Sequence, residues 1–158
     1  MKTKDVLGVA VSVFVCLLAG ALGSFYTTPA IPVWYAGLNK PFFTPPSWLF
    51  APVWTTLYIM MGVSAYIIWK KRKESIEAAK GLVIFAGQLF LNAMWSVVFF
   101  GYKDIFFALL VIIFLWALIL MCMIQFNKLS RNAMLLLIPY IVWVSFATLL
   151  NAAIWLLN

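Results

Sequence analysis

The sequence predicts an all-α integral membrane protein built as a bundle of five transmembrane helices. Its residues are 66% hydrophobic and only 9% charged, whereas a soluble domain is about half apolar and about a quarter charged. A chain with so little polar surface cannot cover a water-soluble globule. Five apolar runs, each near the roughly 20 residues that cross the hydrocarbon core, then set the number of helices.

The apolar runs also predict the bounds of the five helices. They cover about residues 6–26, 48–69, 81–100, 105–126 and 133–157. Each run is long and continuous and does not alternate as membrane strands do. The length of 158 residues suits one compact domain over residues 1–158. The basic start and the first run resemble a signal peptide, but the length of that run favours a retained helix.

The positions of lysine and arginine predict the orientation in the membrane. The basic residues fall into two groups at opposite ends of the predicted helices. The larger group consists of Lys2, Lys4, Lys70, Lys71, Arg72, Lys73, Lys80, Lys128 and Arg131. The opposite side carries only Lys40 and Lys103. Because cytoplasmic loops are rich in basic residues, we expect a cytoplasmic N-terminus and an exterior C-terminus. Topology therefore explains the net charge of +7 without a nucleic-acid partner.

One connection, residues 27–47, is much longer than the others. Its stretch WYAGLNKPFFTPPSW, with Trp48 at its end, holds three prolines and five aromatic rings. Proline fixes the backbone without a ladder of hydrogen bonds, and long ordered loops are often functional lids. We therefore predict that this loop is structured and closes a site as a lid. An aromatic belt at the membrane interface is the alternative interpretation.

Several kinds of chemistry are missing from the predicted helices. The sequence has no histidine, and its four acidic residues lie at helix ends or in loops. Cys16 and Cys122 each lie inside an apolar run, where a cysteine is usually a small buried hydrophobe. These features argue against catalytic triads, carboxylate pairs and proton-coupled transport. We expect neither a metal nor a bound cofactor.

Three helices each present a stripe of aromatic, amide and small residues on one face. The stripes are Trp54, Tyr58, Met61 and Ala65; Gln88, Asn92, Trp95 and Phe99; and Tyr140, Trp143, Ala147 and Asn151. The pattern alone favours core packing over a ligand pocket, since rings and amides commonly join membrane helices. Bulky rings beside amides nevertheless favour a cavity with a few polar groups, as in small-molecule sites. Small residues around Gly20 and Gly23 in the first run favour close packing within the chain.

The same regions carry motifs that resemble a known family. The residues are Trp34, Tyr35, Leu38, Lys40, Pro41, Pro45, Pro46, Trp48, Pro52, Val53, Trp54, Leu57 and Tyr58; Leu91, Asn92, Trp95, Ser96, Phe99 and Phe100; and Leu137, Ile138, Pro139, Tyr140, Trp143, Phe146, Ala147, Thr148, Leu150 and Asn151. Together they resemble the TspO/MBR family, the tryptophan-rich sensory proteins, also called translocator proteins or peripheral benzodiazepine receptors. The resemblance spans nearly the whole chain.

The resemblance implies a five-helix fold, often a homodimer, whose cavity opens toward the first loop. It implies as ligands porphyrins and other haem-related tetrapyrroles, sterols, and synthetic isoquinolines or benzodiazepines. Carried over to this chain, the ligand-binding residues are Tyr35, Pro45, Trp54, Tyr58, Asn92, Trp95, Phe99, Tyr140, Trp143 and Ala147. Some bacterial members are reported to degrade protoporphyrin in light, which makes Trp54 and Trp143 the candidate catalytic residues.

The end of the last helix separates the ligand classes. Sterol-binding members carry a tyrosine followed by a basic residue there, whereas residues 151–158 of this chain contain no lysine or arginine. The resemblance therefore favours a bacterial type, in the cytoplasmic membrane, with a tetrapyrrole ligand. Three functions stay open: a receptor, sensor or carrier; an enzyme of light- and oxygen-dependent porphyrin degradation; and a structural or assembly protein whose stripes only pack.

Overall fold

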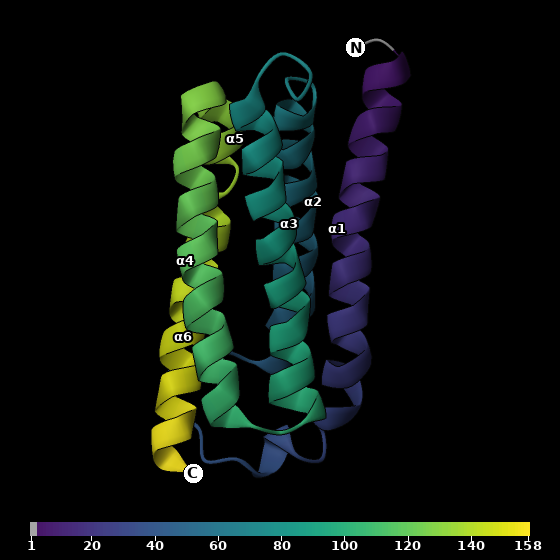
Figure 1. Ribbon diagram of the computed structural model, residues 1–158. Helices are drawn as coiled ribbons and strands as arrows, with labels where there is room; N and C mark the ends of the chain where they lie inside the picture. Colours follow the sequence, from purple (N-terminus) through teal and green to yellow (C-terminus); the bar gives the residue numbers. More distant parts are fainter. Residues whose placement is uncertain (1–2) are drawn as a thin grey trace.

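The computed structural model describes residues 3–158, so Lys2 of the topology count lies outside the described residues. Within this part, the secondary structure is helical throughout (Figure 1). The long helices are α1 (Thr3–Ala30), α2 (Phe50–Trp69), α3 (Ile76–Ser96), α4 (Ile105–Leu129) and α6 (Ile138–Leu157). Five spans are long and apolar enough to cross a membrane. The predicted all-α bundle of five transmembrane helices is confirmed.

Four short elements extend or connect these helices. The first loop contains η1 (Tyr35–Gly37), and η2 (Ser47–Leu49) leads directly into α2. The π-helical turn η3 (Val97–Gly101) continues α3, and α5 (Arg131–Leu135) precedes α6 within the fifth span. The helices run up and down the bundle, with α1 at one side and α4 and α6 at the other (Figure 1). The loop of residues 31–46 crosses the end that carries the C-terminus.

The first helix is longer than the sequence pattern predicts. It continues past residue 26 to Ala30, so the first loop begins at residue 31. The hydroxyl of Thr27 donates to the backbone carbonyl of Gly23 at 2.9 Å, and the hydroxyls of Ser24 and Thr28 lie 3.3 Å apart. These hydroxyls form hydrogen bonds within the helix, so the helix continues through them.

The fifth span is interrupted near its start, where the sequence predicts one continuous helix. Helix α5 ends at Leu135, and α6 begins at Ile138 with Pro139 in its first turn. Proline has no backbone N–H to bond to the preceding turn. The N–H of Leu137 instead bonds to the carbonyl of Met134 at 2.9 Å, which tightens the turn between the two helices.

Helices α1 and α2 approach each other most closely in the half of the bundle that carries the N-terminus. Gly62 of α2 faces the backbone of Val13, where an added Cβ would lie 2.5 Å from the Val13 Cα. Nearer the N-terminus, Asp5 accepts a hydrogen bond from the Tyr66 hydroxyl at 2.9 Å and pairs with Lys70 at 2.9 Å. This half of the α1–α2 contact is therefore held by both packing and polar bonds.

Candidate ligand-binding cavity

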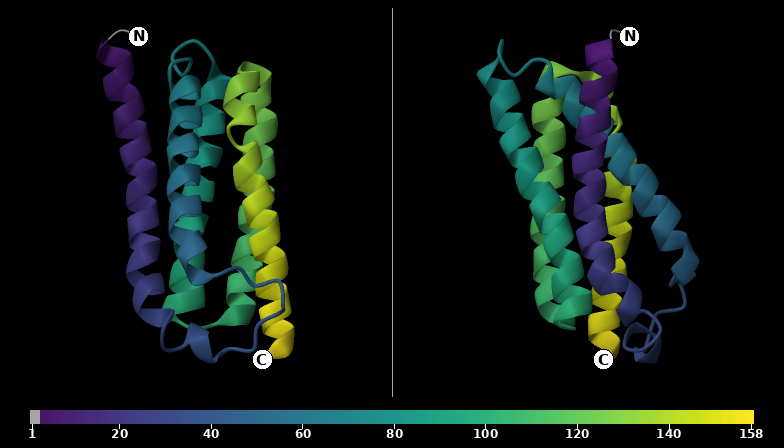
Figure 2. Two further views of the ribbon diagram at one scale, coloured as in Figure 1. Left: turned by 180° about the vertical axis from the view of Figure 1, so that it is seen from behind. Right: turned by 90° about the vertical axis from the view of Figure 1, so that its right-hand side faces the viewer.

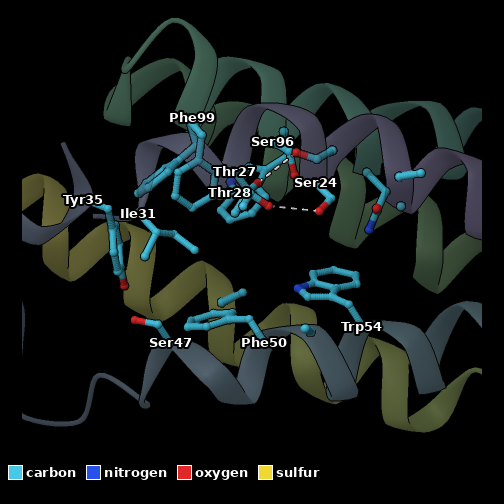
Figure 3. A pocket seen from close by; sticks show the side chains of 18 of the residues that line it. Ser24, Thr27, Thr28, Ile31, Tyr35, Ser47, Phe50, Trp54, Ser96 and Phe99 are labelled. Carbon is cyan, nitrogen blue, oxygen red and sulfur yellow. Dashed lines mark hydrogen bonds between the residues drawn. The ribbon is translucent and has the colours of Figure 1, made fainter. Parts of the chain in front are cut away.

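A cavity of about 390 Å³ lies in the half of the bundle that carries the first loop. Its walls come from α1, α2, the end of α3 with η3, and α6, and Tyr35 of η1 closes one side. Figure 3 shows Phe50 and Trp54 of α2 facing Thr27 and Thr28 of α1, with Ile31 at the start of the first loop, across the cavity. The volume falls within the range of about 300–1,000 Å³ that is usual for small-molecule sites.

The structure brings seven of the ten predicted ligand-binding residues to this cavity. They are Tyr35, Trp54, Tyr58, Asn92, Trp95, Phe99 and Ala147. Tyr140 is only 1% exposed and lies behind Asn92, where it bonds to the Asn92 amide. Trp143 lines a separate hollow between α2 and α6, and Pro45 lines neither space. A direct contact with ligand stays a prediction for all ten.

The loop side of the cavity is closed by aromatic rings. Trp34 packs edge-on against Phe99 with ring centroids 5.3 Å apart, and Tyr35 lies 5.8 Å from Phe100. Trp95 stacks on Phe99 at 5.2 Å. Burial raises the pKa of the Tyr35 phenol above its usual value, so its hydroxyl stays neutral beside the cavity.

The floor of the cavity carries a chain of buried polar side chains. The hydroxyl of Tyr58 donates to the Asn92 carbonyl oxygen, and the Asn92 amide donates to the Tyr140 hydroxyl at 3.0 Å. Tyr140 then donates to Gln88 Oε1 at 2.8 Å. Among the described residues, Gln88 Nε2 finds no hydrogen-bond partner. The chain thus runs from the cavity into the core of the bundle.

The indoles of Trp54 and Trp95 are held by different contacts. Trp54 stacks on Tyr58 with centroids 5.6 Å apart, and Figure 3 shows its ring turned into the cavity. The Trp95 indole N–H donates to Asn151 Oδ1 at 3.0 Å, and the Asn151 amide donates to the Ile105 carbonyl at 2.9 Å. Trp95 is therefore held by its indole N–H, while Trp54 is held by ring packing on Tyr58 and Tyr140 and lines the cavity.

Sequence reasoning missed the wall that α1 contributes. Gly20, Ser24, Thr27 and Thr28 all line the cavity. The signal was present in the small and hydroxyl-bearing residues of the first apolar run. The predicted close packing around Gly20 is confirmed, because the Tyr58 ring fills the space where a Cβ would lie.

The cavity can bind through ring faces, hydroxyls and amides. Its lining residues, all within the described part of the chain, include no charged side chain. Among residues 3–158, no three His, Cys, Asp or Glu side chains gather as metal ligands would. Such a lining suits a flat apolar molecule that has a few polar atoms at its edge.

Comparison with known protein families gives a match over nearly the whole chain. The model of the TspO/MBR family matches residues 12–156. The chain belongs to the TspO/MBR family. The tryptophan-rich protein TspO of Chlorobaculum tepidum is 42% identical, covering 98% of each chain. The translocator protein of Bos taurus is 40% identical over 87% of this chain and 82% of its own.

A third relative carries the name of a sensor. The tryptophan-rich sensory protein of Cereibacter sphaeroides is 36% identical over 93% of this chain and 92% of its own. Membership of the TspO/MBR family supports a membrane receptor or sensor role and the binding of small hydrophobic ligands. With its five apolar spans, this TspO/MBR protein is a multi-pass integral membrane protein.

Proposed function

We propose that this TspO/MBR protein is a membrane receptor, sensor or carrier that binds tetrapyrroles such as protoporphyrin, and other flat hydrophobic ligands. The observation that carries the proposal is the uncharged cavity of about 390 Å³ between four helices, with aromatic walls and a polar floor. Aromatic faces stabilise a flat ring system by stacking. The amide and hydroxyl at the floor fix its orientation.

The side chains suggest how a macrocycle would lie. Its face would stack on Trp54, with Trp95 and Phe99 on the opposite wall. A polar edge would meet Tyr58 and Asn92, which already share a hydrogen bond. Trp143 was the second expected stacking surface, but its place in the hollow between α2 and α6 gives the main role to Trp54.

The first loop acts in this proposal as the lid of the cavity. Lys40 supports its structure, because the ammonium donates to the carbonyls of Tyr35, Ala36 and Leu38 at 2.8, 3.1 and 3.0 Å. The same ammonium lies 5.0 Å from the centre of the Tyr35 ring. Together with the short helix η1, these bonds keep Tyr35 over the cavity.

The second candidate is light- and oxygen-dependent degradation of protoporphyrin. It is favoured by the position of Trp54, an oxidisable indole at the wall where the porphyrin would stack. The excited porphyrin and dioxygen would supply the reactivity, so that no acid, base or metal is needed. The protein would orient the substrate beside the indole.

Matched substitutions of two tryptophans separate these functions. Trp54→Phe keeps an aromatic face, so it should weaken dark binding of protoporphyrin by about 1 kcal/mol, or several-fold. Trp143→Phe is the matched control, because that ring lies outside the cavity. Dark affinity is measured by quenching of tryptophan fluorescence, and turnover by absorbance under illumination in air. Selective loss of turnover in Trp54→Phe supports the enzyme, and parallel losses support a binder.

The remaining expectations belong to the same proposal. The natural setting is a bacterial cytoplasmic membrane with the N-terminus in the cytoplasm, and a homodimer is the expected assembly. Synthetic isoquinolines or benzodiazepines should compete for the cavity, whereas sterols should bind weakly. If protoporphyrin does not quench the tryptophan fluorescence of the wild-type protein in the dark, the structural or assembly function replaces the proposal.

A further inference from the structure

The exposed residues of the cavity wall all lie on two facing helices. Three of them come from α1 and three from the segment that η2 and α2 form. They are Ala21, Ser24 and Thr28, and Ser47, Ala51 and Thr55. Their spacing of three or four residues places each trio along one side of its helix. Every lining residue from α3, η3 and α6 is buried or half-buried.

The loop end of the cavity is shut by comparison. Tyr35 is buried, with 7% of its surface exposed, and packs against the rings of Phe99 and Phe100. Residues 36–46 contribute nothing to the cavity lining. The loop is also tied to the end of α6: the Asn39 N–H donates to Asn158 Oδ1, and Asn158 Nδ2 donates to the Asn39 carbonyl, each at 3.0 Å.

The separation of α1 and α2 at this height has a structural cause. Gly62 lets α2 touch the α1 backbone at Val13. This contact lies further from the first loop than Tyr58 does. Beyond that contact the Tyr58 ring fills the space at Gly20. The right-hand view of Figure 2 shows α2 slanting away from α1 toward the loop end. The two helices thus diverge where the cavity lies.

We propose that ligands pass between this cavity and the lipid phase sideways, through an opening between α1 and α2 that we call the α1–α2 portal. Its rim is the set of six exposed lining residues. The identity of the ligand rests on the proposed function, but the opening itself does not. The portal admits flat molecules that dissolve in the bilayer and carry polar groups at one edge. The loop stays closed during their passage.

The rim has the chemistry that such a passage requires. Thr55 donates its hydroxyl to the Ala51 carbonyl at 2.8 Å, and the hydroxyls of Ser24 and Thr28 lie 3.3 Å apart. Hydroxyls bonded in this way cost little within lipid and keep free lone pairs as acceptors. They give a passing polar edge a partner, whereas the two alanines leave space for an apolar ring.

A labelling experiment tests the portal without any ligand. Ala147, on the α6 wall, is replaced by cysteine and the protein is reconstituted in liposomes. An alkyl maleimide dissolved in the bilayer and a charged maleimide in water are compared, and peptide mass spectrometry distinguishes the new thiol from Cys16 and Cys122. The rate of labelling by the bilayer reagent should exceed that of the aqueous reagent several-fold.

Bulky residues at the rim should then close the path. Ala21→Phe, Ala51→Phe and their combination should lower the rate of bilayer labelling several-fold. Leu22→Phe and Ile59→Phe are matched controls on exposed, non-lining positions of the same helices and should leave the rate unchanged. Thermal melting in detergent confirms that each variant is folded, and the single variants remain if the double variant is not.

Passage through the loop end of the cavity is the competing path, and a variant of the loop contact tests it. Asn158→Ala removes two of the three hydrogen bonds that tie Asn39 of the loop to the end of α6, and should leave both labelling rates unchanged. Faster aqueous labelling in Asn158→Ala, or bilayer labelling that persists in the rim variants, overturns the portal.

Dark protoporphyrin quenching adds a second measurement on the same variants. The rim variants should slow both the capture and the release of protoporphyrin several-fold. Absence of any quenching in the wild-type protein overturns the proposed ligand, and the labelling rates still decide the portal.

Discussion

Removal of the Tyr140 hydroxyl should destabilise the bundle more than removal of the Tyr58 hydroxyl. The two tyrosines lie at different points of the same polar chain. Tyr140 is 1% exposed and bonds to both Asn92 and Gln88. Within this set of polar side chains Tyr58 bonds only to Asn92, and it lines the cavity. Tyr→Phe at either position removes one oxygen and leaves the ring in place.

The magnitudes follow from the number of bonds lost and from what replaces them. A hydrogen bond between membrane helices averages about 0.6 kcal/mol and reaches about 1.7 kcal/mol. Tyr140→Phe removes two bonds and strands the Asn92 amide and the Gln88 oxygen away from solvent, so we expect a loss of about 1–3 kcal/mol. Tyr58→Phe removes one bond and leaves only the Asn92 oxygen without a partner, at the surface of the cavity. The expected loss is about 0.5–1 kcal/mol.

Unfolding of the detergent-solubilised protein by a graded SDS titration, followed by circular dichroism, measures both losses. The binding assay should reverse the order, because Tyr58→Phe changes the cavity surface and Tyr140→Phe does not. We expect dark protoporphyrin affinity to fall several-fold in Tyr58→Phe and to stay unchanged in Tyr140→Phe. Equal destabilisation by the two variants, or a larger effect from Tyr58→Phe, would refute this interpretation of the polar chain.

Three further predictions concern packing, strain and topology. Gly62→Ala places a Cβ 2.5 Å from the Val13 Cα, and should cost about 1–3 kcal/mol by overpacking; Gly37→Ala, with open space around it, should be neutral in the same unfolding assay. Lys103 has a φ of 60°, so Lys103→Gly should raise stability by about 1 kcal/mol, and an unchanged or lower midpoint would contradict that strain. A reporter that is active only in the cytoplasm should stay silent at the C-terminus, and strong activity there would reverse the predicted orientation.

The fold was predictable because a bilayer places strict demands on a chain. Apolar runs of sufficient length become helices, since the backbone has no other way to satisfy its polar groups in lipid. The exact ends were less predictable. Thr27 and Thr28 look like loop residues in the sequence, yet their hydroxyls bond within α1, which extends to Ala30. Pro139 marks the break in the fifth span, but hydropathy alone does not register it.

The site was predictable where a stripe and the cavity coincide. Trp54 and Tyr58 share a helix face and both line the cavity. Trp143 and Ala147 also share a face, but the periodicity of a helix says nothing of height or of which neighbour lies opposite. Trp143 lines the hollow between α2 and α6, and of these two residues only Ala147 lines the cavity. The α1 wall escaped notice because small residues signal close packing as readily as a cavity.

The claim that this cavity holds the ligand is tested most directly by filling it. Ala147 lines the cavity with 9% of its surface exposed, so Ala147→Phe should occupy the ligand's space. Ala117→Phe is the matched control, because Ala117 is exposed on α4 and does not line the cavity. In a dark titration with protoporphyrin, the account predicts saturable tryptophan quenching for the wild type and Ala117→Phe, and its loss in Ala147→Phe. Wild-type affinity in a folded Ala147→Phe protein would contradict it.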